Sequence, residues 1–131
     1  MNNMTPNQEE LQKLMQHPDD KPVVMINLLK FKTTTETGES GAAVYARYAQ
    51  NAAPLVAKVG GKLLWQGNAE QYLVGGDADR WDKVLLVEYP SRAAFMQMTQ
   101  LPEFQEVQKD RLAALERTVL IASTTVLKTP S

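Results

Sequence analysis

The segment Pro22–Lys32 (PVVMINLLKFK) constrains the fold most, because its apolar residues do not alternate with polar ones. Val23, Met25 and Leu29 have apolar neighbours at most of the intervening positions, as in a strand that is buried on both faces. The segment Asp82–Tyr89 (DKVLLVEY) has the same character. We therefore expect two central strands in a sheet that is covered on both sides.

Helices are predicted between and around these strands. In residues 42–59 apolar side chains recur every three or four residues, and Gly60-Gly61 supplies the positive φ that commonly ends a helix. Capping hydroxyls or a helix-starting proline mark the other helices, which we expect over residues 6–16 after Thr5, 92–99 after Ser91, and 102–118 from Pro102.

Two further strands complete the predicted sheet, over residues 62–74 and 119–127. We interpret the Gly67-Asn68 interruption in the first as a bulge. After the N-terminal helix the order is β-α-β-β-α-β with the second helix divided, which is a ferredoxin-like α+β fold with an antiparallel sheet. Right-handed crossovers place the helices on one face, so we expect a second copy of the chain to cover the other.

Composition excludes several classes of function. The 14 basic and 15 acidic residues give a formal charge of −1, which offers no basic field for nucleic acid. The chain has 0 cysteines, which excludes disulfides and thiolate chemistry. No apolar run approaches the roughly 18 residues of a membrane span, and the N-terminus lacks the features of a signal peptide. We expect a cytoplasmic protein with neither a nucleic acid nor a membrane as partner.

A set of motifs follows in order along residues 22–121: VVMINLLKF in the first strand, two tyrosines followed by Ala-Pro, Gly-Gly-Lys, Trp-Asp, Glu-Tyr-Pro-Ser-Arg with a later Phe, and Pro-Glu-Phe with a later Arg. In these motifs the chain resembles the bacterial DUF1330 domain proteins of the dimeric α+β barrel superfamily. The resemblance implies a homodimer and a small-ligand pocket between the sheet and the helices of each subunit. It implies no particular reaction.

The resemblance also suggests a division of the chain. Residues 22–127 correspond to the DUF1330-like domain, residues 1–21 to a helical extension that precedes it, and residues 128–131 to a short tail.

Three polar residues interrupt apolar faces and are candidates for a binding pocket. Asn27 interrupts the first strand, Tyr48 lies on the inward face of the helix over 42–59, and Arg111 interrupts the apolar face of the last helix. A buried polar group needs a hydrogen-bond partner, and a few such groups in an apolar wall are the usual form of a small-molecule site. Each could equally be a satisfied core residue, and the register that decides which face Asn27 occupies cannot be read from the sequence.

Trp65 and Glu88 complete the candidate pocket. Trp65 would be an apolar anchor or an aromatic wall, and Glu88 shares a strand face with Leu86, where apolar neighbours would raise the pKa of its carboxyl. Glu88 could instead form an ion pair with Arg92. Arg92, like Arg111, has the guanidinium geometry that binds a carboxylate through two hydrogen bonds.

No catalytic residue, metal or cofactor can be assigned. His17 is the single histidine, and it stands outside the domain in a segment that we interpret as an exposed turn. We expect a small-molecule-binding protein, which could be a cofactor-independent enzyme that oxidises or isomerises a small organic acid or aromatic compound. The alternative is a non-catalytic ligand-binding or assembly module.

Overall fold

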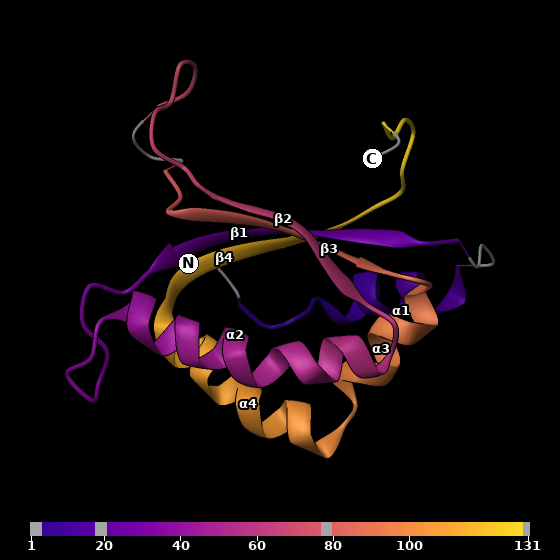
Figure 1. Ribbon diagram of the computed structural model, residues 1–131, viewed down its shortest axis with the longest axis horizontal. Coiled ribbons are helices and arrows are strands. Elements are labelled where there is room, and N and C mark those ends of the chain that lie inside the picture. The colour runs from indigo at the N-terminus through magenta and orange to yellow at the C-terminus, as the bar shows by residue number, and fades with distance from the viewer. Residues whose placement is uncertain (1–3, 18–20, 77–79, 130–131) are drawn as a thin grey trace.

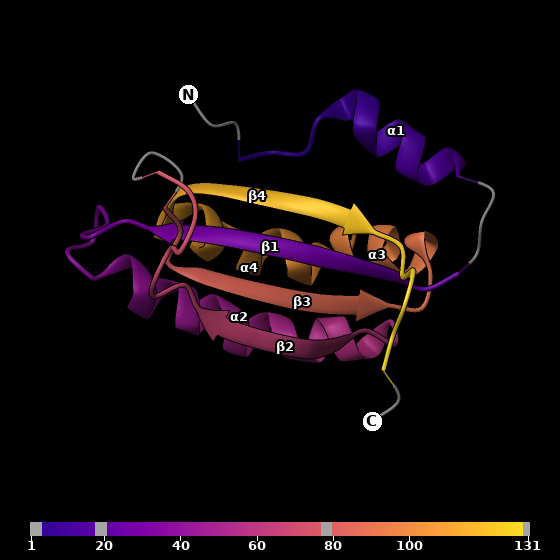
Figure 2. The same ribbon diagram turned by 90° about the horizontal axis from the view of Figure 1, so that it is seen from above.

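The computed structural model describes residues 4–17, 21–76 and 80–129. Its strands form one antiparallel sheet in the order β2-β3-β1-β4, with bounds β1 Val23–Phe31, β2 Lys62–Asn68, β3 Lys83–Tyr89 and β4 Leu115–Ser123. The helices of the described residues are α1 Gln8–Gln16, α2 Gly41–Lys58, α3 Arg92–Thr99 and α4 Pro102–Ala114. Helices α2, α3 and α4 cover one face of the sheet (Figure 1), and α1 lies beside the β4 edge (Figure 2). This is the expected α+β, ferredoxin-like fold.

Side-chain caps fix where the helices begin. The Ser91 hydroxyl accepts a hydrogen bond from the amide of Ala94 at 3.1 Å and starts α3, as predicted. The Ser40 hydroxyl caps α2 in the same way, through the amide of Ala43 at 3.1 Å. The prediction for α1 is wrong in detail, because Asn7 and not Thr5 is its N-cap residue.

Three boundaries differ clearly from the predicted ones, and one of them is the end of β4, which lies at Ser123 and not at residue 127. The last helix ends at Ala114, whose carbonyl accepts a hydrogen bond from the Lys32 amide at 2.9 Å, and β4 begins at once with Leu115. The β-branched residues that follow favour a strand, so the segment after Ala114 joins the sheet and does not extend the helix. The strand β2 ends at Asn68, and its irregularity lies between Leu63 and Trp65, so it is not at Gly67.

The residues of β1 alternate between two faces. Val23, Met25 and Leu29 lie at 0, 3 and 0% exposure and face the helices, while Val24, Ile26 and Leu28 are only half-buried on the opposite side. We call the first side the covered face and the second the open face. Asn27 shares the row of Met25 and Leu29, so it belongs to the covered face.

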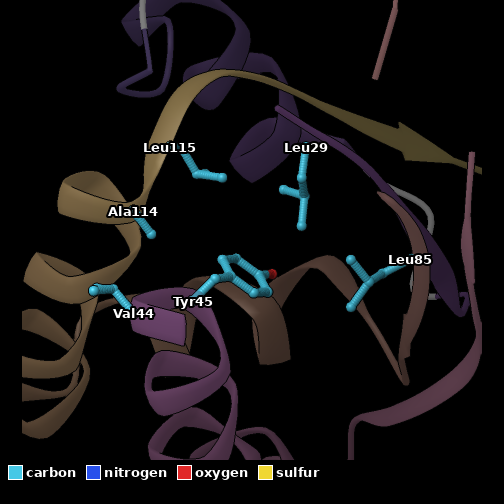
Figure 3. Packing of buried hydrophobic residues seen from close by; sticks show 6 residues of the cluster. All are labelled: Leu29, Val44, Tyr45, Leu85, Ala114 and Leu115. Carbon is cyan, nitrogen blue, oxygen red and sulfur yellow. The ribbon is translucent and has the colours of Figure 1, made fainter. Parts of the chain in front are cut away.

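The core between sheet and helices has two clusters. One brings together a strand residue from each of β1, β3 and β4 with residues of α2 and α4 (Figure 3), namely Leu29, Leu85, Leu115, Val44, Tyr45 and Ala114. The other lies toward α3 and contains Val23, Met25, Tyr89, Met98 and Phe104. Of the described helices, none has the length and apolar character to cross a bilayer.

Two segments rise from the sheet on the side of the open face (Figure 1). The loop between β2 and β3, residues 69–82, has Leu73 at 86% and Val74 at 92% exposure; residues 77–79 within it lie outside the described residues. The segment after β4 carries Val126 at 99% and Leu127 at 90% exposure. The predicted tail, 128–131, is described only to residue 129.

Candidate functional site

A cavity of about 1070 Å³ lies between the covered face and the helices. Its lining comes from all four strands above, α2, α3 and α4 below, and α1 along one side. Most of these residues are apolar or aromatic, as expected for a small-molecule pocket. The polar groups that interrupt this wall define the candidate site.

Three of the five residues predicted from the sequence line this cavity: Asn27, Tyr48 and Arg111. The Asn27 amide Nδ2 donates to the Met25 carbonyl at 3.4 Å, and no described residue donates to its Oδ1. A polar atom of a ligand can therefore be bound by the Asn27 oxygen without breaking an existing hydrogen bond.

The contacts that hold Arg111 are with neutral groups. Its Nη2 donates to the Thr118 hydroxyl at 3.3 Å, and that hydroxyl donates to the Leu28 carbonyl at 2.8 Å. No described carboxylate lies within ion-pair distance of Arg111. No carboxylate of the described residues therefore pairs with the guanidinium beside the cavity.

Aromatic rings form one wall of the site. Tyr45 contacts Phe31 and Tyr48 with ring centroids 5.5 and 5.3 Å apart, and Tyr48 meets Phe104 edge-on at 6.5 Å. Because α2 places Tyr45 and Tyr48 one turn apart on its inward face, both rings reach the sheet. The wall gives a bound molecule apolar contact on the side of α2.

Burial keeps the tyrosine hydroxyls protonated. It raises the pKa of Tyr45 to about 12, and the nearby charges of Tyr48 and Arg111 have smaller, opposite effects. Burial also raises the pKa of Tyr48, against the lowering effect of Arg111, and raises that of Tyr89. At neutral pH these groups can donate a hydrogen bond but cannot act as bases.

Trp65 and Glu88 do not belong to the cavity, which corrects the predicted site. The extra residue Leu64, inserted between Leu63 and Trp65, moves Trp65 to the open face, where it pairs with Leu86. Glu88 is on the open face too, because it shares the row of Leu86. The structure therefore places these two predicted residues across the sheet from Asn27.

Glu88 has partners other than the one considered from the sequence. Its carboxylate lies 3.7 Å from both the Lys62 and the Lys128 ammonium groups, and its side chain is 15% exposed. Lys128 reaches it from the C-terminal segment, which crosses the open face (Figure 2). Arg92, the alternative partner, turns into the cavity.

Arg92 is the residue whose role the sequence underestimates. It is the first residue of α3, and its Nη1 atom is buried with no hydrogen-bond partner among the described residues. The sequence marks it as a cation near the end of β3, but only the fold shows that its Nη1 has no partner in the part of the chain that the structure describes.

The proton acceptors of the lining lie on and just after α1, at the edge of the cavity. Glu10 forms an ion pair with Lys13 at 3.6 Å, and His17 is exposed at the C-cap of α1. Within the described residues no cluster of histidine or carboxylate side chains could hold a metal ion. Away from that edge, the lining offers hydrogen-bond donors, amide groups such as that of Asn27, and apolar surface.

Comparison with known proteins gives the family. A family profile described as "Domain of unknown function (DUF1330)" matches residues 38–125, about two thirds of the chain. The chain belongs to this family. It is also similar to a protein of unknown function from Rhodopseudomonas palustris, whose crystal structure has 32% sequence identity and a TM-score of 0.91 and covers 98% of this chain and 100% of that one.

More distant structures share the fold alone. A hydroxynitrile lyase from Passiflora edulis is 16% identical with a TM-score of 0.62, covering 86% of this chain and 100% of the lyase. A dimeric protein of unknown function with a ferredoxin-like fold from Bacteroides fragilis is 16% identical with a TM-score of 0.54, covering 79% and 96%. No curated protein matches this DUF1330 chain.

Proposed function

We propose that this DUF1330 protein binds a small, partly apolar organic molecule in the cavity under its sheet. The observation that carries the proposal is the cavity of about 1070 Å³ whose apolar wall is interrupted by Asn27, Tyr48 and Arg111. A space of this size exceeds the few water-sized voids of an ordinary packed core. A bound molecule would find an acceptor in the Asn27 oxygen and donors in the side chains of Tyr48 and Arg111.

Binding fits the lining better than catalysis by proton abstraction. The tyrosines have raised pKa values, and the lining carboxylate Glu10 is already ion-paired with Lys13 at the edge. A general base must reach the proton that it removes, and the interior offers none among the described residues. We therefore favour the ligand-binding alternative over the enzymatic one.

The test uses N-phenyl-1-naphthylamine, a neutral dye that fluoresces in apolar sites. We expect the wild-type protein to bind it, and Leu120→Trp to weaken binding by about fivefold or more, because Leu120 lines the cavity at 44% exposure and a larger ring there occupies ligand space. The control is Gln50→Trp, which adds the same ring on the exposed side of α2, outside the cavity and the open face. Absence of dye binding, or equal affinity in the two variants, would contradict the proposal.

We also propose that the open face binds a second copy of the chain. Val24, Ile26 and Leu28 are half-buried there, and Trp65 and Ile121 are exposed at 53% and 44%. Soluble monomers rarely leave so continuous an apolar face in water. The β2–β3 loop and the C-terminal segment, which carry exposed apolar residues, rise on the same side (Figure 1) and would contact the second copy there.

Self-association can be tested at the centre of this face. Ile26→Lys places a charge in the middle of the proposed interface and should convert a dimer to a monomer in sedimentation velocity. Gln50→Lys, on the exposed side of α2, is the matched control and should leave the dimer intact. A monomeric wild-type protein at micromolar concentration would reject the proposal.

A further inference from the structure

The charges around the cavity do not balance. The chain as a whole has a formal charge of −1. The lining contains four basic residues and one acidic residue, which are Lys13, Lys62, Arg92, Arg111 and Glu10. The cavity is therefore a local concentration of positive charge in a slightly acidic protein, and such a field favours an anion.

Two of these four cations already have carboxylate partners. Lys13 lies 3.6 Å from Glu10, and Lys62 lies 3.7 Å from Glu88 on the far side of the sheet edge. Arg92 and Arg111 have no carboxylate within ion-pair distance among the described residues. The unbalanced charge thus resides on two guanidinium groups.

Of these two residues, Arg92 is the one with a buried N–H group that lacks a hydrogen-bond acceptor among the described residues. Arg111 donates to the Thr118 hydroxyl at 3.3 Å, whereas Nη1 of Arg92 is buried and donates to nothing that the structure describes. A buried N–H group without an acceptor is costly, and buried polar groups almost always have a partner. A bound acceptor at Arg92 would supply the missing partner.

The surroundings of Arg92 define what else the ligand must be. Arg92, Phe95 and Thr99 occupy one face of α3, and all three line the cavity. Across from them the sheet presents Met25 and Val87. A bare inorganic anion would leave this apolar wall without contact, so the anionic group must belong to a larger apolar molecule.

We propose that Arg92 is the ligand-anchoring residue of the cavity and that the ligand is an organic carboxylate with an apolar body. The planar guanidinium can donate two parallel hydrogen bonds to a carboxylate. The apolar body then extends along Met25 and Val87 toward the aromatic wall and Asn27. This inference rests on the proposed ligand-binding function and adds the chemical class of the ligand and the residue that selects it.

The experiment compares octanoate with octanamide as displacers of N-phenyl-1-naphthylamine. The two molecules have the same chain, and only octanoate is charged. In the wild-type protein the dissociation constant of octanoate, measured by displacement of the dye, should be about tenfold lower than that of octanamide. This difference is expected when a charge-assisted hydrogen bond replaces a neutral one. Inorganic phosphate, which has no apolar body, should not displace the dye.

Variants locate the preference. Arg92→Gln should weaken octanoate binding by about tenfold or more while octanamide and the dye change by less than about twofold. Lys109→Gln removes the same charge from the exposed side of α4, where Lys109 pairs with Glu106, and should retain the preference for octanoate. A variant Arg92→Gln that still prefers octanoate would overturn the assignment to Arg92.

The outcomes separate the two proposals. Failure of the dye to bind the wild-type protein rejects the ligand-binding function itself. Dye binding with equal displacement by octanoate and octanamide rejects only the carboxylate inference, and this comparison needs no variant. If Arg92→Gln does not fold, Arg92→Met serves, because it keeps the apolar stem; octanoate should raise the melting temperature of the wild-type protein and not of Arg92→Met.

Discussion

On β1, Val23, Met25 and Leu29 face the helices, whereas Val24, Ile26 and Leu28 face away from them. On the covered face the polar groups project into a cavity, and the Arg92 guanidinium there lacks a partner. On the open face the Glu88 carboxylate is paired with two lysines, and apolar side chains such as Trp65 are exposed. Neighbouring residues of one strand thus line a cavity on one side and, on the other, an apolar face that we propose is used for assembly.

The largest expected effect separates Leu29 from Leu28. Leu29→Ala removes a side chain at 0% exposure from the core and should lower the free energy of unfolding by about 2–5 kcal/mol at every protein concentration. Leu28→Ala should cost less, and its cost should vary with protein concentration, because an interface contributes stability through association. Urea unfolding at several protein concentrations measures both. If both variants lose the same free energy of unfolding at every protein concentration, the open face does not contribute stability through association.

A second, smaller effect concerns the protonation of the covered face. Burial raises the pKa of Tyr45 from 10.0 to about 12, so the folded chain holds this proton more tightly than the unfolded chain. The resulting stability is complete below pH 10 and is lost as the pH rises through the folded pKa. In Tyr45→Phe, the decrease in the free energy of unfolding at alkaline pH should be smaller than in the wild-type protein by on the order of 2 kcal/mol.

Urea unfolding across the alkaline range tests this prediction. Burial also raises the pKa values of Tyr48 and Tyr89, so Tyr45→Phe should reduce the alkaline loss of stability without abolishing it. An unchanged dependence on pH would show that Tyr45 is not protected from ionisation by the covered face.

The smallest expected effect lies on the open face. Glu88→Gln removes the charge that holds Lys62 and Lys128, and should cost about 1 kcal/mol or less, declining between about 0.05 M and 1 M salt. Glu106→Gln breaks a pair with Lys109 in which both side chains are more than 70% exposed, and should cost less still. A Glu88→Gln effect that is independent of salt would indicate that packing, not charge, fixes this residue.

The sequence predicts which residues share a strand face, but not which face the helices cover. It correctly places Glu88 and Leu86 on the same face of their strand, but that face is the open one. Asn27 could be placed only once the register with β3 was known. Trp65 fails for a more local reason, since a single inserted residue at Leu64 changes the face of every residue after it.

The remaining differences also reflect long-range contacts. The predicted last helix is too long because Ala114 bonds to Lys32, a residue far away in the sequence. Arg92 and Arg111 are indistinguishable as guanidinium groups in the sequence, and only the Thr118 contact and the absence of a described acceptor at Arg92 Nη1 separate them. The element order, the cap at Ser91 and the DUF1330 resemblance could be predicted because they depend on residues close together in the chain.

The position of β1 in the sheet affects how the protein can form on the ribosome. β1 is the first strand to be synthesised, yet it lies between β3 and β4, and its Val24 pairs with Ser123 near the other end of the chain. A nascent chain that has emerged only as far as α2 has no strand with which β1 can pair. One edge of β1 therefore stays unpaired until β3 has been synthesised, and the other until β4 has, so the sheet can be completed only late in translation.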